Sequence, residues 1–108
     1  MFDRFKEVTG VLLGECRLVY RIHATQRMFE RDISGEDVRN VLHAGWVIEK
    51  YGDDYPFPSV LACGADEGGR MLHVVASFDP ATKIVYIITT YIPSVQKWGD
   101  NFTRRRTS

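Results

Sequence analysis

Three basic side chains recur at every fourth position in the first third of the sequence. His23, Arg27 and Arg31 are spaced i, i+4 and i+8, so on a helix they lie along one face, about one turn apart. Ala24 and Met28 occupy the neighbouring stripe, which is expected to pack inward. Such a row can offer two guanidinium groups to a phosphate and an imidazole that transfers protons near neutral pH. The alternative is a solvated helix face on which Arg31 stabilises the helix C-terminus.

A second candidate cluster involves the later part of the chain. His73 is the one ionisable side chain within MLHVVASF (71–78), a segment that otherwise belongs in a core. An odd number of residues in the connection around 79–83 would place His73 opposite Thr89, with Tyr91 on the same face. An even connection would separate them. The alternative is a core histidine with satisfied hydrogen bonds.

The C-terminal end is basic and contains one large aromatic residue. Lys97, Arg104 and Arg105 are accompanied by Arg106 and lie close in sequence to Trp98. Basic side chains beside an aromatic ring can neutralise phosphates and stack a base. Alternatively, Trp98 packs into the core and anchors the C-terminus.

The sequence argues against several other kinds of site. His23, His43 and His73 are too scattered to predict a zinc site, and no glycine-rich loop carries the lysine of a phosphate-binding motif. Cys16 and Cys63 belong to no CxxC motif, so we expect reduced thiols and no disulfide. The sequence therefore predicts no metal site and no cofactor.

Composition and charge are those of an ordinary globular protein. Of the 108 residues, 44% are hydrophobic and 26% are charged, and the formal net charge is zero. The charges are unevenly spread, with +2 over residues 1–31, −6 over residues 32–79 and +4 over residues 80–108. The N-terminal residues are too charged for a signal peptide, and no apolar run reaches the roughly 18 residues of a membrane span. We expect a single cytoplasmic domain, 1–108, that does not enter the membrane.

Periodicity predicts an α+β fold in which helices precede strands. Helices are expected over 2–9 and 23–31 and again after Ser34, a good N-cap that forms a capping box with Asp37; Gly45 then ends that helix. Residues rich in β-branched and aromatic side chains predict strands, of which the last four form an antiparallel meander; the segments are 17–22, 46–51, 60–65, 71–78 and 84–91. The tail after residue 98 is expected to be frayed or helical.

The chain resembles a family of small bacterial domains of unknown function that is grouped with the RelE/ParE-like toxin superfamily. The resemblance is carried by HATQRMFERDISGEDVRNVLHAGWVIEKY (23–51), DDYPFPS (53–59), RMLHVVASFD (70–79) and VYIITTYIP (85–93). It implies helices packed on a curved antiparallel sheet of about four strands. It also implies a partner, a cognate antitoxin, which in such pairs often carries a YgiT-type zinc finger.

Members of that superfamily cleave RNA, free or on the ribosome, without a metal ion. The resemblance therefore implies an endoribonuclease of a type II toxin–antitoxin pair, in which the 2′-hydroxyl attacks the adjacent phosphate. His23, His73 and Tyr91 would transfer protons or orient the nucleotide. The expected RNA-binding residues are Arg27, Arg31, Lys97, Arg104 and Arg105. A neutral chain with an acidic middle segment keeps a second hypothesis open, a non-catalytic protein-binding module, and a third, an unrelated role.

Overall fold

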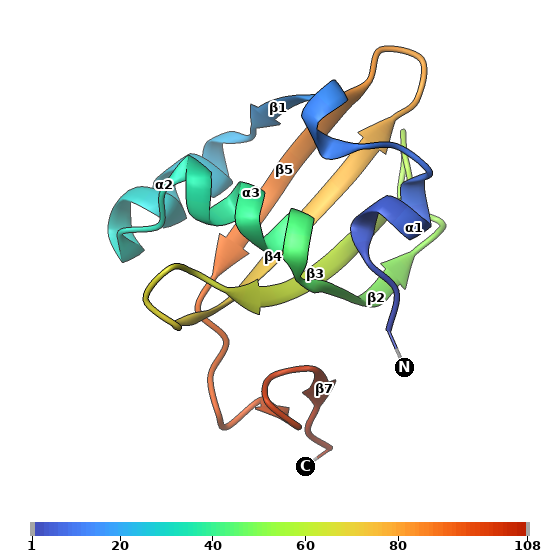
Figure 1. Ribbon diagram of the computed structural model, residues 1–108. Helices are drawn as coiled ribbons and strands as arrows, with labels where there is room; N and C mark the ends of the chain where they lie inside the picture. The colour runs from blue at the N-terminus through green and yellow to red at the C-terminus, as the bar shows by residue number, and fades with distance from the viewer. Residues whose placement is uncertain (1, 108) are drawn as a thin grey trace.

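The computed structural model describes residues 2–107, which form an α+β fold with a mixed five-stranded sheet (Figure 1). Its elements in chain order are α1 (Phe5–Thr9), the 3₁₀ helix η1 (Leu13–Glu15), β1 (Arg17–Tyr20), α2 (Ile22–Arg31), α3 (Gly35–Ala44), β2 (Trp46–Tyr51), β3 (Ser59–Ala65), β4 (Met71–Asp79), β5 (Ile84–Tyr91), β6 (Trp98–Gly99) and β7 (Arg104–Arg105). Helix–strand order and the four successive strands β2 to β5 agree with the sequence prediction.

The sheet differs from the predicted one in size and direction. Its strand order is β1-β5-β4-β3-β2, and β2 to β5 form the expected antiparallel meander. β1, however, lies parallel to β5 at the sheet edge, with Arg17 opposite Ile84. The prediction of an antiparallel sheet of about four strands is therefore wrong. The pattern of apolar residues in a strand indicates which residues share a face of the sheet. It does not identify a neighbouring strand that lies far away along the chain.

Helix α3 is built as its sequence predicts. The Ser34 hydroxyl accepts from the Asp37 amide at 2.9 Å, and the Asp37 carboxylate accepts from the Ser34 amide at 2.9 Å, which completes the capping box. The helix ends at Ala44, before Gly45, but Gly45 does not adopt the left-handed conformation of a typical C-terminal glycine. Its role is instead to let α3 approach β3 closely.

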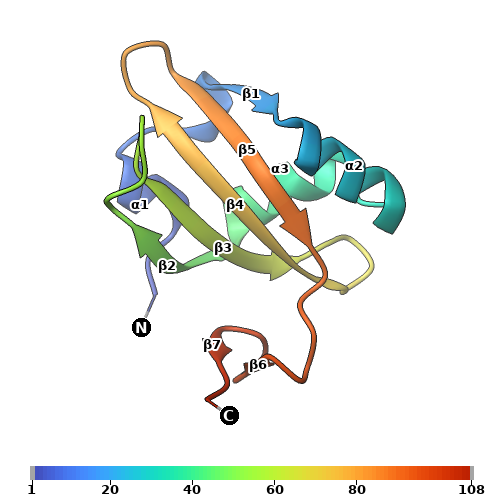
Figure 2. The same cartoon turned by 180° about the vertical axis from the view of Figure 1, so that it is seen from behind.

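Helices α1, α2 and α3 all cover one face of the sheet, while the opposite face is seen in Figure 2. The core lies between these layers and is made of fully buried aliphatic side chains of α3, β3, β4 and β5, among them Val38, Val41, Leu42, Ala62, Leu72, Val74, Val85 and Ile87. From α2, Ala24 is buried and Met28 is half-buried, as the inward stripe predicted. Ile22 differs from the prediction, which placed it in a strand over 17–22. It is the first residue of α2 and is 70% exposed, and β1 ends at Tyr20.

The pairing of β4 with β5 contains a one-residue bulge. Asp79 pairs with Ile84, so the connection is even, which by itself would put His73 and Tyr91 on opposite faces. The register then shifts between Val75 and Ala76, where β5 has Ile88 in excess. As a result His73 lies opposite Tyr91, and the expectation that it lies opposite Thr89 is wrong.

The C-terminal end is a small hairpin, not a frayed or helical tail. β6 and β7 pair antiparallel, with Trp98 opposite Arg105. Trp98 is only 4% exposed and its ring contacts His73, which confirms that it packs inward and anchors this segment. The hairpin covers part of the sheet face that carries no helix.

Candidate functional site

An open groove of about 470 Å³ lies between α2 and the C-terminal end of β5. Two of its lining residues, Arg27 and Arg31, come from α2, and Tyr91 ends β5. The remaining lining residues are Thr89, Ile92, Pro93 and Ser94. The structure therefore brings together in one groove four residues that the sequence analysis had placed in two separate clusters: Arg27, Arg31, Thr89 and Tyr91.

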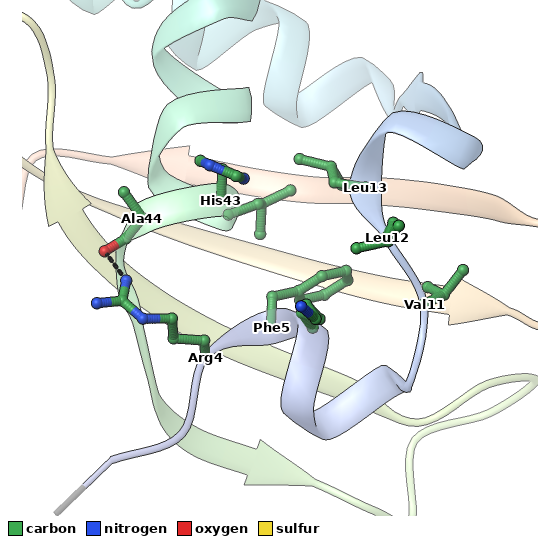
Figure 3. A pocket seen from close by; sticks show the side chains of 9 residues that line it. Arg4, Phe5, Val11, Leu12, Leu13, His43 and Ala44 are labelled. Atoms are coloured by element: carbon green, nitrogen blue, oxygen red, sulfur yellow. Dashed lines mark hydrogen bonds between the residues drawn. The ribbon is translucent and has the colours of Figure 1, made fainter.

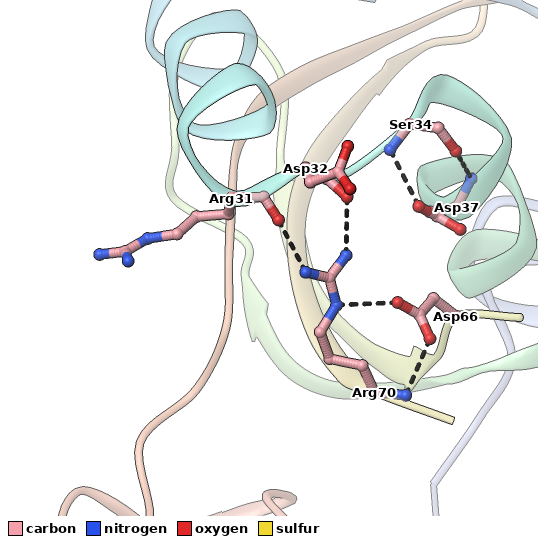
Figure 4. A network of polar contacts seen from close by, with 6 residues as sticks. All are labelled: Arg31, Asp32, Ser34, Asp37, Asp66 and Arg70. Carbon is pink, nitrogen blue, oxygen red and sulfur yellow. Dashed lines mark hydrogen bonds and ion pairs between the residues drawn. The ribbon is translucent and has the colours of Figure 1, made fainter. Parts of the chain in front are cut away.

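The end of α2 is fixed by an arginine from the turn between β3 and β4 (Figure 4). Arg70 donates to the main-chain oxygens of Arg31 at 2.7 Å and Asp32 at 2.9 Å, and its Nε is paired with Asp66 at 2.8 Å. These bonds satisfy carbonyl groups that the helix C-terminus leaves free. The Arg31 guanidinium points away from this network. No ion pair among the described residues includes Arg27 or Arg31, so no carboxylate there competes with a ligand for either guanidinium.

His73 contacts the groove residue Tyr91 and is itself fully buried. Its Nδ1 is 3.2 Å from the Tyr91 hydroxyl, and its Nε2 is 2.7 Å from the main-chain oxygen of Phe102. The Trp98 ring packs edge-on against the imidazole, with 4.4 Å between ring centroids. His73 can therefore reach a ligand in the groove only through Tyr91, which is half-buried.

Burial dominates the electrostatics of this pair. It lowers the pKa of His73, although the hydrogen bond to the Phe102 carbonyl and the nearby Glu49 carboxylate oppose the shift. Burial also raises the pKa of Tyr91. At neutral pH the pair is consequently a neutral imidazole hydrogen-bonded to a neutral phenol.

We expect the buried imidazole to make stability depend on pH. Because the pKa of His73 is lower in the folded protein than in the unfolded chain, the unfolded chain binds more protons below its own pKa of about 6.5. The contribution of His73 to the free energy of unfolding should thus be complete above that pH, and it should be lost as the pH falls towards the folded-state pKa. The other ionisable groups around His73 are Glu49, Arg105, Tyr91 and Cys63.

Urea unfolding at about pH 7.5 and about pH 5 measures this dependence. A His73→Gln variant should lose most of the difference between the two pH values. An equal difference in wild type and variant would contradict the prediction.

The remaining predicted site residues do not line the groove. His23 is exposed on α2, and Lys97 is exposed between β5 and β6. Arg104 pairs with Asp100 at 2.9 Å. The Arg105 guanidinium binds both carboxylate oxygens of Glu49, at 2.7 and 3.0 Å. Sequence reasoning did not anticipate Glu49, Phe102 or Arg70, because their roles depend on chain segments that meet only in the fold.

A separate cavity of about 320 Å³ lies among α1, η1 and the end of α3 (Figure 3). Phe5, Leu12 and Leu13 line it. At its rim Arg4 donates to the main-chain oxygen of Ala44 at 2.5 Å. Its guanidinium thus complements the C-terminus of α3, and the cavity contains none of the residues predicted to act chemically.

Comparison with known protein families identifies the chain at the level of its family. The family model described as domain of unknown function DUF4258 matches residues 20–92, which is more than half of the chain. The chain belongs to the DUF4258 family. No match was found among curated proteins or among solved structures.

The region that matches the DUF4258 model begins at the end of β1 and ends just after β5. It contains Arg27, Arg31, His73 and Tyr91, whereas the β6–β7 hairpin that covers His73 follows it. Within residues 2–107 of this DUF4258 protein, no cluster of three or more His, Cys, Asp or Glu side chains is arranged to hold a metal ion. No helix in that range is long and apolar enough to span a membrane.

Proposed function

We propose that this chain is an endoribonuclease that cleaves RNA without a metal ion, by attack of the 2′-hydroxyl on the adjacent phosphate. The observation that carries the proposal is the hydrogen bond of Tyr91 to buried His73, at the wall of a groove that Arg27 and Arg31 also line. Together these groups supply a proton acceptor and fixed positive charge, two of the three things that the reaction needs; the third is a proton donor for the departing 5′-oxygen.

Tyr91 and His73 act as a proton relay. Tyr91 removes the proton of the 2′-hydroxyl and passes its own hydroxyl proton to Nδ1 of His73. A bond forms between the 2′-oxygen and phosphorus, and the bond from phosphorus to the 5′-oxygen breaks. The departing 5′-oxygen takes a proton from water in the open groove, and the hydroxide that forms is neutralised when His73 returns its proton through Tyr91. The products are a 2′,3′-cyclic phosphate and a 5′-hydroxyl. The Glu49 carboxylate favours the imidazolium that forms during the relay.

Arg27 and Arg31 bind the reacting phosphate and stabilise the negative charge that it gains in the transition state. Lys97 is free to contact a flanking phosphate, since it is exposed. Arg104 and Arg105 would first have to exchange Asp100 and Glu49 for RNA, so their contribution to binding is secondary. His23 lies one turn before Arg27 and extends the basic row along α2.

The biological role that we infer is that of a toxin whose activity a cognate antitoxin holds in check. This inference rests on the resemblance to RelE/ParE-like toxins and includes the zinc-finger type of antitoxin. A protein partner is also supported by two exposed apolar side chains on the outer face of α2, where Ile22 is 70% and Phe29 is 89% exposed. That same pair of side chains favours the second candidate, a non-catalytic protein-binding module.

The test is cleavage of a single-stranded RNA by the purified protein in the presence of a chelator, with DNA of the same sequence as the comparison. We expect RNA to be cut to 2′,3′-cyclic phosphate ends and DNA to remain intact, because DNA lacks the nucleophile. Replacing Tyr91 with Phe removes only the hydroxyl and should lower kcat by about 10²–10⁴-fold. The matched control is Tyr55→Phe, since Tyr55 is 94% exposed in a loop.

Two outcomes would reject this function. Cleavage of RNA and DNA at equal rates would exclude attack by the 2′-hydroxyl. Wild-type activity in the Tyr91→Phe variant would exclude the relay. No cleavage at all, combined with tight binding of the protein encoded next to this one, would favour the protein-binding module.

A further inference from the structure

The β6–β7 hairpin holds a backbone conformation that L-residues adopt reluctantly. Three consecutive residues between its strands have positive φ, at 49° for Asp100, 57° for Asn101 and 69° for Phe102. Asp and Asn tolerate the left-handed region, but a bulky residue such as Phe rarely occupies it. A turn of this kind persists only where the surrounding structure holds it in place.

Side chains from both strands of the hairpin hold it against the sheet. The Trp98 ring packs edge-on against His73, at an interplanar angle of 86°. The Arg105 guanidinium binds Glu49 of β2 with two hydrogen bonds and lies 4.7 Å from the centre of the Trp98 ring. Bidentate pairing of this kind fixes orientation as well as distance.

The held turn places the carbonyl oxygen of Phe102 2.7 Å from Nε2 of His73. A carbonyl oxygen can only accept a hydrogen bond, so Nε2 must carry the proton. In a neutral imidazole Nδ1 is then unprotonated and accepts from the Tyr91 hydroxyl at 3.2 Å. The phenol proton therefore points inward, and the phenol oxygen presents lone pairs towards the groove.

From this geometry we infer that the C-terminal hairpin is a positioning device: through the carbonyl of Phe102 it selects the Nε2–H tautomer of His73, and thereby makes Tyr91 a proton acceptor towards the groove. Trp98 and Arg105 act as positioning residues, because they hold the hairpin and do not line the groove. The role of Tyr91 as a catalytic proton acceptor rests on the proposed function, whereas the assignment of the His73 tautomer does not.

The rival interpretation is that the hairpin is only a basic RNA-binding patch. Arg104 and Arg105 are adjacent, and each forms one ion pair. The pair of Arg104 with Asp100 stays within the hairpin, while the pair of Arg105 with Glu49 ties the hairpin to the sheet. Arg104→Gln is therefore a matched control for Arg105→Gln with the same change in charge.

The experiment is long-range ¹H–¹⁵N NMR of the histidine rings, applied to the full chain near neutral pH. In wild type we expect His73 to give the pattern of a single Nε2–H tautomer, and Arg104→Gln should preserve it. Arg105→Gln and Trp98→Ala should convert it to a mixture of tautomers and raise its pKa, because the ring becomes hydrated. If Trp98→Ala fails to fold, Arg105→Gln still tests the inference, since it changes an exposed side chain.

An Nδ1–H tautomer in wild type would overturn the inference. The inference would also be overturned if Arg105→Gln, and Trp98→Ala where it folds, retained a single Nε2–H tautomer. RNA cleavage supplies an independent readout: Arg105→Gln should lower kcat at least several-fold, because it releases the hairpin from Glu49, whereas the effect of Arg104→Gln should be confined to KM, since it removes only a secondary RNA contact. If the tautomer behaves as expected but wild type cleaves no RNA, the proposed function fails while the assignment of the hairpin stands.

Discussion

Replacing both Arg27 and Arg31 with alanine is expected to lower kcat/KM for RNA by at least about 10³-fold, because the loss of even one charge-stabilising donor typically costs about 10²–10³-fold. Both side chains are exposed and line the groove beside Tyr91. Neither belongs to an ion pair among the described residues, so their removal leaves no carboxylate without a partner. The free energy of unfolding should therefore stay close to that of wild type.

Single-turnover cleavage together with urea unfolding measures both parts of this prediction. The matched control replaces Arg17 and Arg39 with alanine, since these arginines are also exposed, carry the same charge and lie outside the groove. Equal losses in the two double variants would show that overall charge matters and that the groove does not. Full activity in the Arg27→Ala/Arg31→Ala variant would remove these residues from the mechanism.

Replacing Gly45 with alanine should destabilise the fold by about 3 kcal/mol, at the upper end of what overpacking usually costs. A Cβ atom at this position would lie 2.5 Å from the main-chain oxygens of both Cys63 and Val41. Backbone atoms cannot rotate away as a side chain can, so α3 would have to move off β3. The Tm should fall by about 10 °C or more.

Thermal unfolding followed by circular dichroism tests this expectation. Gly52→Ala is the control, because a Cβ at Gly52 meets no atom within 4 Å and Gly52 has no positive φ. A Tm for Gly45→Ala within about 2 °C of the control would mean that α3 does not depend on this close approach.

Local patterns in the sequence were sufficient for the elements that depend on local interactions. The capping box of Ser34 and Asp37 predicted the start of α3, and enrichment in β-branched and aromatic residues predicted β2 to β5. The i, i+4 spacing of Arg27 and Arg31 correctly placed both on one edge of α2. The arrangement of the groove could be anticipated to this extent because it follows from helix and strand geometry.

Other features depend on contacts between distant segments, and the sequence did not predict them. The parallel pairing of β1 with β5 has no local signature, since the two strands are far apart in the chain. The hairpin after β5 is stabilised by Glu49 of β2 and by His73 of β4, not by its own strand propensity. The anchor from Arg70 to the end of α2 likewise joins a turn and a helix that become neighbours only after folding.

Ile88 is one residue more than the pairing of β5 with β4 needs. The alternation of buried and outward side chains along β5 therefore reverses at this residue. Before Ile88 the odd-numbered Val85 and Ile87 are buried towards the helices, whereas after it the even-numbered Thr90 is buried and Tyr91 faces the other way. An alignment that reads β5 as an uninterrupted alternation would therefore assign its last residues to the wrong side. When another sequence is aligned with β5, a gap placed near Ile88 changes which of its residues is assigned to the positions of Thr89 and Tyr91 in the groove.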